Sequence, residues 1–511
     1  MKSRRDFKGS LGVIDVGAHS VRLEIVQFNK KGEIEVLEDL SHTVPLGRDV
    51  FHKGAIQPEN IIFTANVLRD FASKMREYEV VFHKAVATSA VREATNRDIF
   101  LNAVKLESGI DLEVLESSEE IRILYLSTKN ILKGIIDLSG KSALICFIGT
   151  GSTHICVVHD GKLHSIGSLR LGTMRIFEEI GQSFSLKKSI GIVDTVVERI
   201  VESVVINHFE GKKPDLFIAA GAAVRTLTML GGFDIRKNIV SIPVQKIDEV
   251  IDKITKNSPE ELAEKYGISD INAQSISPCC EILHNFIGST CAHKLIVPMI
   301  NTRDAIIDEC MRQINNDRDP FVADIISVAT AIGQKYKYLE SHAESVRHNS
   351  LKIFDALKAI HRIGGRGQLM LEVAAILHDI GQFVNARQHH KHSCYLIAHS
   401  QIPGISPEEL SVIAAIARYH RRGNPKTSHP EYMCLSPENR VLVSALAGIL
   451  RIADALDHAH SSKLSDFSVS YDDKTVTIST KGSYDLTIEQ IELKKRSDLF
   501  YSVFSRKVII Q

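Results

Sequence analysis

The sequence predicts two related lobes of mixed helices and strands, followed by a helical domain and a small C-terminal α/β subdomain. A strand–turn–strand pattern at residues 13–23 recurs at residues 145–155, at an offset of 132 residues. Between residues 343 and 457, apolar side chains recur at three- and four-residue spacing, which is typical of amphipathic helices. From residue 467 onwards, polar and apolar residues alternate, which indicates strands. We therefore expect four parts, at residues 1–135, 136–315, 320–460 and 461–511.

The composition restricts the class of partner. The 511 residues include 62 Lys and Arg and 62 Asp and Glu, so the net charge argues against a protein that binds nucleic acid over its whole surface. A local cluster of donors could still bind an anionic substrate. No apolar segment reaches the roughly 20 residues that cross a bilayer, so we expect no membrane association. The eight cysteines lack Cys-x-x-Cys spacing, which indicates a reducing compartment and hence a cytoplasmic protein.

The repeated turn is the first candidate for a binding site. Gly17 and Ser20 in the first copy correspond to Gly149 and Ser152 in the second, which also contains Gly151. Glycine turns bring backbone N–H groups close together, and the missing Cβ atoms let a phosphate group approach them. We expect these five residues to bind phosphate from two sides of a cleft. The alternative is a pair of ordinary tight hairpins without a ligand.

Two charged residues lie where helices are expected to start. Arg92 follows a predicted strand at residues 80–87, and its guanidinium in the first turn of a helix can bind phosphate. Glu119 and Glu120 come just before a predicted helix at residues 121–133. Carboxylates in this position are also common as simple partners of the helix dipole, so that interpretation stays open.

The helical domain carries histidines and aspartates that could bind metal. His378 and Asp379 close an apolar, helix-like segment, and further candidates occupy helical positions: His348, His392, His420 and Asp454. Imidazole together with carboxylate suits Fe, Mn, Zn, Co or Ni, and a site with open positions activates water. The alternative is a set of surface and capping histidines.

The order of these motifs resembles the Ppx/GppA family of exopolyphosphatases and guanosine pentaphosphate phosphohydrolases over nearly the whole chain. Residues 15–23, 87–94 and 116–122 carry the likeness. It implies the two-lobed fold of actin, hexokinase and the heat-shock ATPases, with Glu120 as the catalytic base and Asp15 as a ligand of Mg²⁺. Phe147 stands where the family's second loop has an aspartate, so Asp15 is the carboxylate that remains in these two loops.

Residues 343–457 look like the HD domain of longer family members. This likeness implies that His348, His378, Asp379 and Asp454 bind a metal, and that His392 and His420 complete a second metal site. An exposed face of this helical domain could also support a homodimer.

Three functions are consistent with the sequence. The leading hypothesis is hydrolysis of a phosphoanhydride in polyphosphate or in guanosine penta- or tetraphosphate, with the reaction in the cleft between the lobes. A second places a metal-dependent phosphohydrolase reaction in the helical domain, so that the lobes only bind ligand. A third is a sensor of polyphosphate or of a guanosine polyphosphate that has no catalytic activity.

Overall fold

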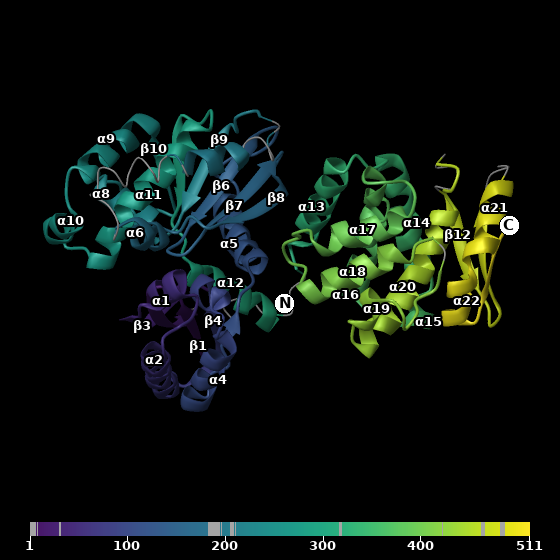
Figure 1. Ribbon diagram of the computed structural model, residues 1–511, viewed down its shortest axis with the longest axis horizontal. Helices are drawn as coiled ribbons and strands as arrows, with labels where there is room; N and C mark the ends of the chain where they lie inside the picture. Colours follow the sequence, from purple (N-terminus) through teal and green to yellow (C-terminus); the bar gives the residue numbers. More distant parts are fainter. Residues whose placement is uncertain are drawn as a thin grey trace. The chain divides into compact units, whose positions relative to one another are not determined.

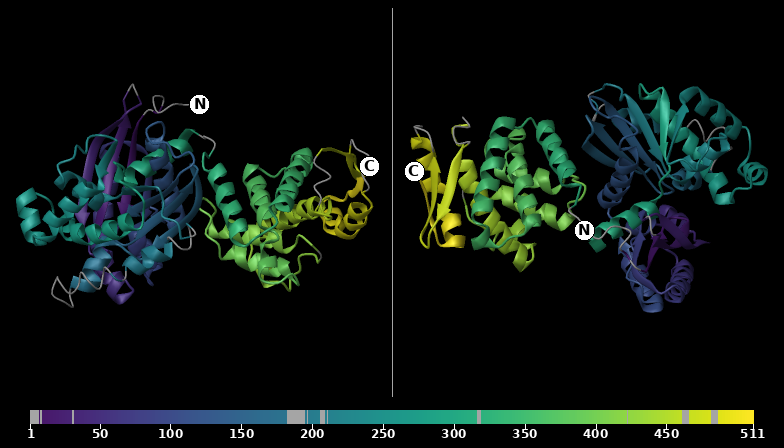
Figure 2. Two further views of the ribbon diagram at one scale, coloured as in Figure 1. Left: turned by 90° about the horizontal axis from the view of Figure 1, so that it is seen from above. Right: turned by 180° about the vertical axis from the view of Figure 1, so that it is seen from behind.

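The chain folds into two compact units, Met1–Phe321 and Val322–Gln511. The computed structural model (Figures 1 and 2) describes residues 7, 9–29, 32–181, 195, 197–204, 209, 211–315, 319–421, 423–460, 466–480 and 486–511. None of the helices in these ranges is long and apolar enough to cross a membrane.

The first lobe is built on a five-stranded sheet with the order β3-β2-β1-β4-β5. Its central strand β1 pairs antiparallel with β2 and parallel with β4. All but one of the side chains of β1 are buried, as expected for a strand covered on both faces. The strands are β1 (Ser10–Val16), β2 (Ser20–Phe28), β3 (Ile34–Thr43), β4 (Val80–Ala87) and β5 (Glu113–Val114).

The second lobe repeats this plan. Its sheet has the order β10-β11-β9-β6-β7-β8, and β6 pairs antiparallel with β7 and parallel with β9. Read from β8, the order and directions match those of the first sheet, with β10 added as an antiparallel edge. The strands are β6 (Ser142–Ile148), β7 (Thr153–His159), β8 (Lys162–Leu169), β9 (Leu216–Ala220), β10 (Ile239–Pro243) and β11 (Lys294–Pro298). The prediction of two related lobes is therefore confirmed.

Helices cover the two sheets, and each lobe has its own apolar core (Figure 1). The helices of the first lobe are α1 (Leu46–Lys53), α2 (Pro58–Glu77), α3 (Ser89–Glu93), α4 (Arg97–Ser108) and α5 (Ser117–Leu132). Those that follow are α6 (Thr173–Gly181), α8 (Ala222–Leu230), α9 (Val244–Thr255), α10 (Pro259–Tyr266), α11 (Asp270–Gly288) and α12 (Thr302–Asn315). Helix α5 also packs against β7 and β8, and α12 packs against β1 and α5. We expected the residues of α12 to belong to the second lobe, but this helix packs against elements of the first lobe.

The second unit begins with a group of helices. They are α13 (Val322–Lys335), α14 (Glu340–Ala356), α15 (Lys358–His361), α16 (Gly365–Leu377), the 3-10 helix η2 (Ile380–Phe383), α17 (His389–Ala398), α18 (Pro407–Arg418), α19 (Pro430–Met433) and α20 (Pro437–Ala455). Helix α16 is apolar nearly all round and most of its residues are buried. It packs against α13, α14, α18 and α20, which makes it central to this group.

A small α/β subdomain completes the second unit (yellow in Figure 2). It contains β12 (Phe467–Tyr471), β13 (Thr475–Thr480), α21 (Thr487–Arg496), α22 (Asp498–Phe504) and β14 (Lys507–Ile510). The strands have the order β12-β13-β14, and β13 pairs parallel with β14. Arg451 of α20 is fully buried and binds the Asp498 carboxylate at 2.9 Å, which ties the helical group to α22.

Candidate functional site

The repeated turns have the same hydrogen bond and line the same cavity. The Gly17 amide donates to the Ser20 carbonyl oxygen at 2.9 Å, and the Gly149 amide donates to the Ser152 carbonyl oxygen at 2.9 Å. Both turns, together with Gly151, line a cavity of about 310 Å³. The two hairpins therefore lie at one site, as predicted. Their binding of phosphate stays a prediction.

Gly151 shows how closely the two lobes approach each other at this cavity. A Cβ atom at this position would overlap the hydroxyl of Ser89 at the start of α3 in the first lobe. Arg175 of α6 also donates to Glu93 of α3 at 2.7 Å, and its guanidinium lies 3.9 Å from the Phe51 ring centroid. These contacts join the lobes beside the cavity.

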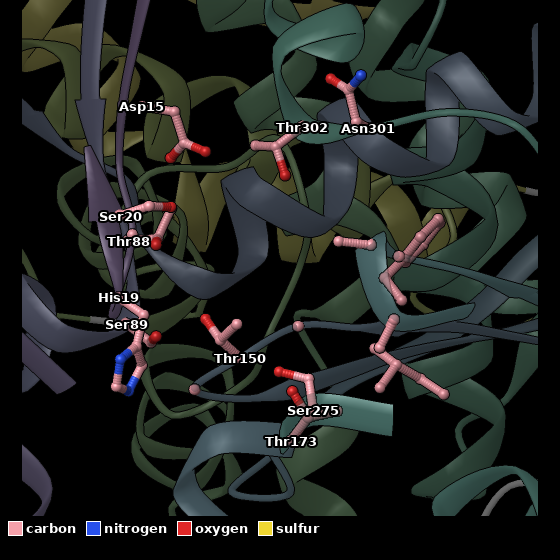
Figure 3. Close-up of a pocket in the computed structure, with 18 of the residues that line it drawn as sticks. Asp15, His19, Ser20, Thr88, Ser89, Thr150, Thr173, Ser275, Asn301 and Thr302 are labelled. Carbon is pink, nitrogen blue, oxygen red and sulfur yellow. The ribbon is translucent and has the colours of Figure 1, made fainter. Parts of the chain in front are cut away.

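Asp15 lies near the end of β1 and points into the cavity (Figure 3). Its Oδ1 atom is buried and has no hydrogen-bond partner among the described residues. Burial raises the pKa of Asp15 to about 6, and Glu120 adds to this increase while Arg22 and Arg303 oppose it. A buried, ionised carboxylate oxygen that accepts no hydrogen bond destabilises the folded protein, and a bound cation would compensate for the missing donor.

Glu120 lies in the first turn of α5 and is held by the side chains of an arginine and a histidine. α5 starts at Ser117, before the predicted position, and so includes this carboxylate. Arg92 Nη1 lies 3.0 Å and His154 Nε2 lies 3.2 Å from Glu120 Oε2. Burial alone would raise the pKa of Glu120, but His154 and Arg92 together lower it to about 2. The carboxylate is therefore ionised at neutral pH. Arg92, which the sequence suggested as a phosphate ligand, is not among the described residues that line the cavity.

His154 is a further site residue, and it was not predicted from the sequence. It is buried on β7, lines the cavity and faces Phe147 across the β6–β7 pair. In the first lobe, Asp15 faces Arg22 in the same way. The offset of 132 residues pairs Arg22 with His154 and Asp15 with Phe147. The repeat could therefore have indicated that His154 lies beside the second turn, as Arg22 lies beside the first.

The other cavity walls carry many uncharged polar side chains. Figure 3 shows residues of the first lobe along one side and residues of the second lobe along the other, with the start of α12 near them. Their hydroxyl and amide groups can donate hydrogen bonds to phosphate oxygens. The labelled examples are Ser20, Thr88, Ser89, Thr150, Thr173, Ser275, Asn301 and Thr302. Among the described residues that line the cavity, Asp15 and Glu120 are the carboxylates.

The second unit contains a separate cluster of histidines and acids. Two groups could each hold a metal ion, and within each group the ligand atoms lie within 4.8 Å of one another. They share one carboxylate, Asp379. The first group is His342, His378 and Asp379, and the second is Asp379, His389 and His420.

The cluster corrects two of the predicted ligands. His348 is exposed on α14 and lies outside both groups, and His342 from the first turn of that helix takes the expected place. His392 on α17 also lies outside both groups, and His389 at the start of the helix replaces it. Asp454 lies beside the first group, with Oδ1 3.4 Å from His342 Nε2.

Both units match models of known protein families. A model described as the Ppx/GppA phosphatase family matches residues 25–312, and one described as Ppx/GppA phosphatase, domain III, matches residues 326–499. Two similar proteins carry the name guanosine-5'-triphosphate,3'-diphosphate pyrophosphatase. That of Photobacterium profundum is 22% identical over 462 residues, which covers 87% of this chain and 86% of the relative. That of Vibrio vulnificus is 23% identical over 479 residues, which covers 92% and 89%.

Two solved structures share the fold of the lobes. A Ppx/GppA family member from Aquifex aeolicus has a TM-score of 0.50 and 23% identity, covering 61% of this chain and 99% of that one. An exopolyphosphatase from Cytophaga hutchinsonii has a TM-score of 0.52 and 16% identity, covering 60% and 99%. At these identities the likeness concerns the two-lobed fold, which agrees with the fold expected from the sequence.

Proposed function

Since the chain belongs to the Ppx/GppA phosphatase family, we propose that its interlobe cavity hydrolyses a phosphoanhydride bond of inorganic polyphosphate or of guanosine penta- or tetraphosphate. The observation that carries this proposal is the meeting of both glycine turns, Asp15 and Glu120 at one cavity. The names of the relatives support the two substrate classes, because one group is named for a guanosine polyphosphate and another for polyphosphate.

The chain's own groups can bind the phosphates from both sides. The backbone N–H groups of Thr150 and Gly151 in the second turn, and the hydroxyls of Ser20 and Ser152, would donate to the phosphoryl oxygens. Arg303 lines the cavity from the start of α12, where Glu24 at 3.1 Å and Asp39 hold its guanidinium. It would add positive charge at the wall.

Asp15 fits the role of a Mg²⁺ ligand. Mg²⁺ sites commonly combine one or two carboxylates with substrate phosphates and waters, and Asp15 offers a buried oxygen that lacks a partner. When bound there, Mg²⁺ would neutralise charge on the transferred phosphoryl group. The aromatic ring of Phe147 supplies no ligand, so the second turn would hold phosphate and not the metal ion.

Glu120 would orient the attacking water and accept its proton. A pKa of about 2 makes it a weak base, since the ideal basic group has a pKa near the working pH. Phosphoryl transfer passes through a loose transition state, so positioning the water matters more than deprotonating it early. Arg92 and His154 fix the carboxylate in place and thereby serve this positioning.

The test is phosphate release by Glu120→Gln with polyphosphate and with guanosine 5'-triphosphate 3'-diphosphate. We expect a loss of about a hundred- to ten-thousand-fold, the usual contribution of a positioned acid–base group. Glu119→Gln is the matched control, because this neighbouring carboxylate pairs with Arg122 and is not among the residues that line the cavity.

The double variant His378→Ala/Asp379→Ala separates the cavity from the helical unit. It should retain most of the phosphate release. Activity that survives Glu120→Gln but disappears in the double variant would move the reaction to the second unit.

We also propose that the protein is cytoplasmic and that an exposed face of its helical group could support a homodimer. The free state of all eight cysteines agrees with a reducing compartment. Cell fractionation tests the location, and sedimentation equilibrium tests the assembly.

A further inference from the structure

We propose that His19 of the first turn is a ligand of the phosphate chain and that it takes up a proton when the chain enters the cavity. This inference rests on the proposed binding of a phosphoanhydride substrate in the cavity, but not on the hydrolysis of that substrate. His19 thus recognises the chain from the first lobe and gives the binding step its own dependence on pH.

His19 lies in the turn between β1 and β2, and it lines the cavity. Figure 3 shows its ring on the side of the first lobe, together with Ser20, Thr88 and Ser89. These neighbours carry hydroxyl groups, which can bind phosphate oxygens as well. His19 therefore belongs to the wall that a phosphate chain would contact.

The ring of His19 is buried without a partner of its own. The residue is 8% exposed, and its Nε2 atom has no hydrogen-bond partner among the described residues. Nδ1 is not buried in this way, which leaves it accessible to a ligand. A polar ring in such a place destabilises the folded protein unless it finds a partner, and a phosphate oxygen would provide one.

His19 is also the basic residue of the cavity wall that no carboxylate of this wall neutralises. The basic side chains among the described residues of the wall are His19, Arg22, His154 and Arg303. The two arginines act on the Asp15 carboxylate, and His154 lies 3.2 Å from Glu120. His19 therefore remains available for an anionic ligand.

The helices packed around the turn contribute a weak opposing charge. Burial lowers the pKa of His19, and Glu178 of α6 opposes this effect. The Glu178 carboxylate also lies 3.5 Å from His52 of α1. Further charged side chains on α1 and α3 are held by partners of their own: Asp49 by Asn60, Arg92 by Glu120, and Glu93 by Arg175. Without a ligand, His19 is therefore neutral at neutral pH.

A phosphate chain would reverse this balance. Each phosphate group brings negative charge to the wall, and an opposite charge within about 4–6 Å favours the protonated form of an imidazole. In the protonated ring both nitrogens are donors, and a hydrogen bond from a charged donor to phosphate is short and strong. The proton comes from the solvent, so binding of one chain should take up as much as about one proton near neutral pH.

The second turn cannot supply an equivalent side chain. The offset of 132 residues places Gly151 where the first turn has His19. A Cβ atom on Gly151 would overlap the Ser89 hydroxyl, so the second turn has no room for a side chain there. The second turn thus offers backbone N–H groups, and the first turn adds an imidazole.

Calorimetry of ligand binding tests the proposal without turnover. Full-length protein in a chelator is titrated with tripolyphosphate, and separately with guanosine 5'-triphosphate 3'-diphosphate, in buffers that differ in ionisation enthalpy. The slope of the observed enthalpy against the ionisation enthalpy of the buffer gives the number of protons taken up. At about pH 7 the wild-type protein should take up more protons than His19→Gln, by as much as about one.

The affinity gives a second readout. His19→Ala should bind tripolyphosphate about ten- to a hundredfold more weakly at about pH 6.5, because it loses a hydrogen bond to a charged group. His19→Gln keeps an amide donor and should lose less. The ring has the higher pKa in the complex, so the advantage of the wild type over His19→Gln is present at low pH and should shrink as the pH rises to about 9.

The chain supplies matched controls. His83 is an exposed histidine on β4 of the same lobe and is not among the described residues that line the cavity, so His83→Gln should behave like the wild type. Asp15 has a pKa of about 6 and could also take up a proton. In the Asp15→Asn background, His19→Gln should still lower the proton uptake. Thermal unfolding shows that each variant folds, and His19→Gln gives the answer if His19→Ala does not fold.

Three results would overturn the proposal. Equal proton uptake in the wild type and His19→Gln would exclude protonation of His19, whatever the affinities. A difference that disappears in the Asp15→Asn background would assign the proton to that carboxylate. Binding of neither ligand would remove the role altogether.

The same titrations separate this inference from the proposed function. Binding with proton uptake but without phosphate release would refute the hydrolysis and leave the role of His19 intact. Phosphate release by a His19→Gln protein with unchanged affinity and unchanged proton uptake would refute the role of His19 alone.

Discussion

Replacing Asp15 with asparagine should make the metal-free protein more stable, although it removes the proposed ligand of Mg²⁺. The free energy that raises a carboxyl pKa from 3.8 to about 6 is about 3 kcal/mol, because one factor of ten corresponds to about 1.4 kcal/mol. The unfolded chain ionises Asp15 more easily than the folded protein does. The buried charge therefore opposes folding by about this amount at neutral pH.

The sign and range of the pH dependence follow from the raised pKa. Below about pH 3.8 both states are protonated and the cost is absent; it grows up to about pH 6 and is constant above it. Asparagine has no charge and no such cost. Asp15→Asn should therefore gain about 1.6 kcal/mol at about pH 5 and about 3 kcal/mol at about pH 7.5. The difference between these values, about 1.4 kcal/mol, does not depend on how well the amide itself fits.

Urea unfolding in the presence of a chelator measures this gain. The chain has no tryptophan whose fluorescence could follow unfolding. Because its two units need not unfold together, hydrogen exchange of peptides from β1 and β2 should be used to measure the stability of the first unit. Asp98→Asn changes a carboxylate whose side chain is 92% exposed and should leave the stability unchanged at both pH values. Added Mg²⁺ should stabilise the wild-type and Asp98→Asn proteins but not Asp15→Asn.

A gain that is equal at the two pH values, or that falls as the pH rises, would refute this reasoning. It would mean that Arg22 and Arg303 fully compensate the buried charge.

Four further variants test other parts of the first unit. Phe147→Asp adds a carboxylate in the second turn and should lower the Mg²⁺ concentration that gives half-maximal phosphate release. An unchanged Mg²⁺ titration would argue against a metal ion between the turns. Gly221→Ala should cost more than about 2 kcal/mol in urea unfolding, because φ is 138° and the new Cβ would overlap a backbone carbonyl. Gly232→Ala, with φ of 78° and open space around it, should cost only about 1 kcal/mol, and equal losses would contradict the steric argument. Arg122→Ala should cost about 1.5–3 kcal/mol, because it removes the 2.9 Å partner of Glu309 while Arg312 stays at 2.6 Å from the same carboxylate. A loss below about 0.5 kcal/mol would show that solvent screens the pair.

The turns could be predicted from the sequence because their determinants are local. A glycine directly after a buried strand and a serine three residues later specify a hairpin in both lobes. The repeat then implies the same environment twice, and Gly17 and Gly149 indeed make the same hydrogen bond. His154 was not predicted because its role depends on Glu120 and Arg92, which come from distant parts of the chain.

The candidate metal-binding histidines were harder to predict because a helix has several faces. His342 and His348 both belong to α14, but six residues at 3.6 residues per turn rotate one side chain about 120° away from the other. Only the packing of neighbouring helices decides which histidine is buried. His378, Asp379 and His420 were easier to find, since they follow the apolar helices α16 and α18 directly.

Because the lobe is repeated within one chain, the two halves of the site can change independently of each other. In an assembly of two identical chains, one mutation would alter both halves of the site at once. Here the two halves lie on one chain, so a substitution at Phe147 leaves Asp15 untouched. One half can therefore keep the acid while the other carries an aromatic ring and an imidazole, which gives the site two unlike sides.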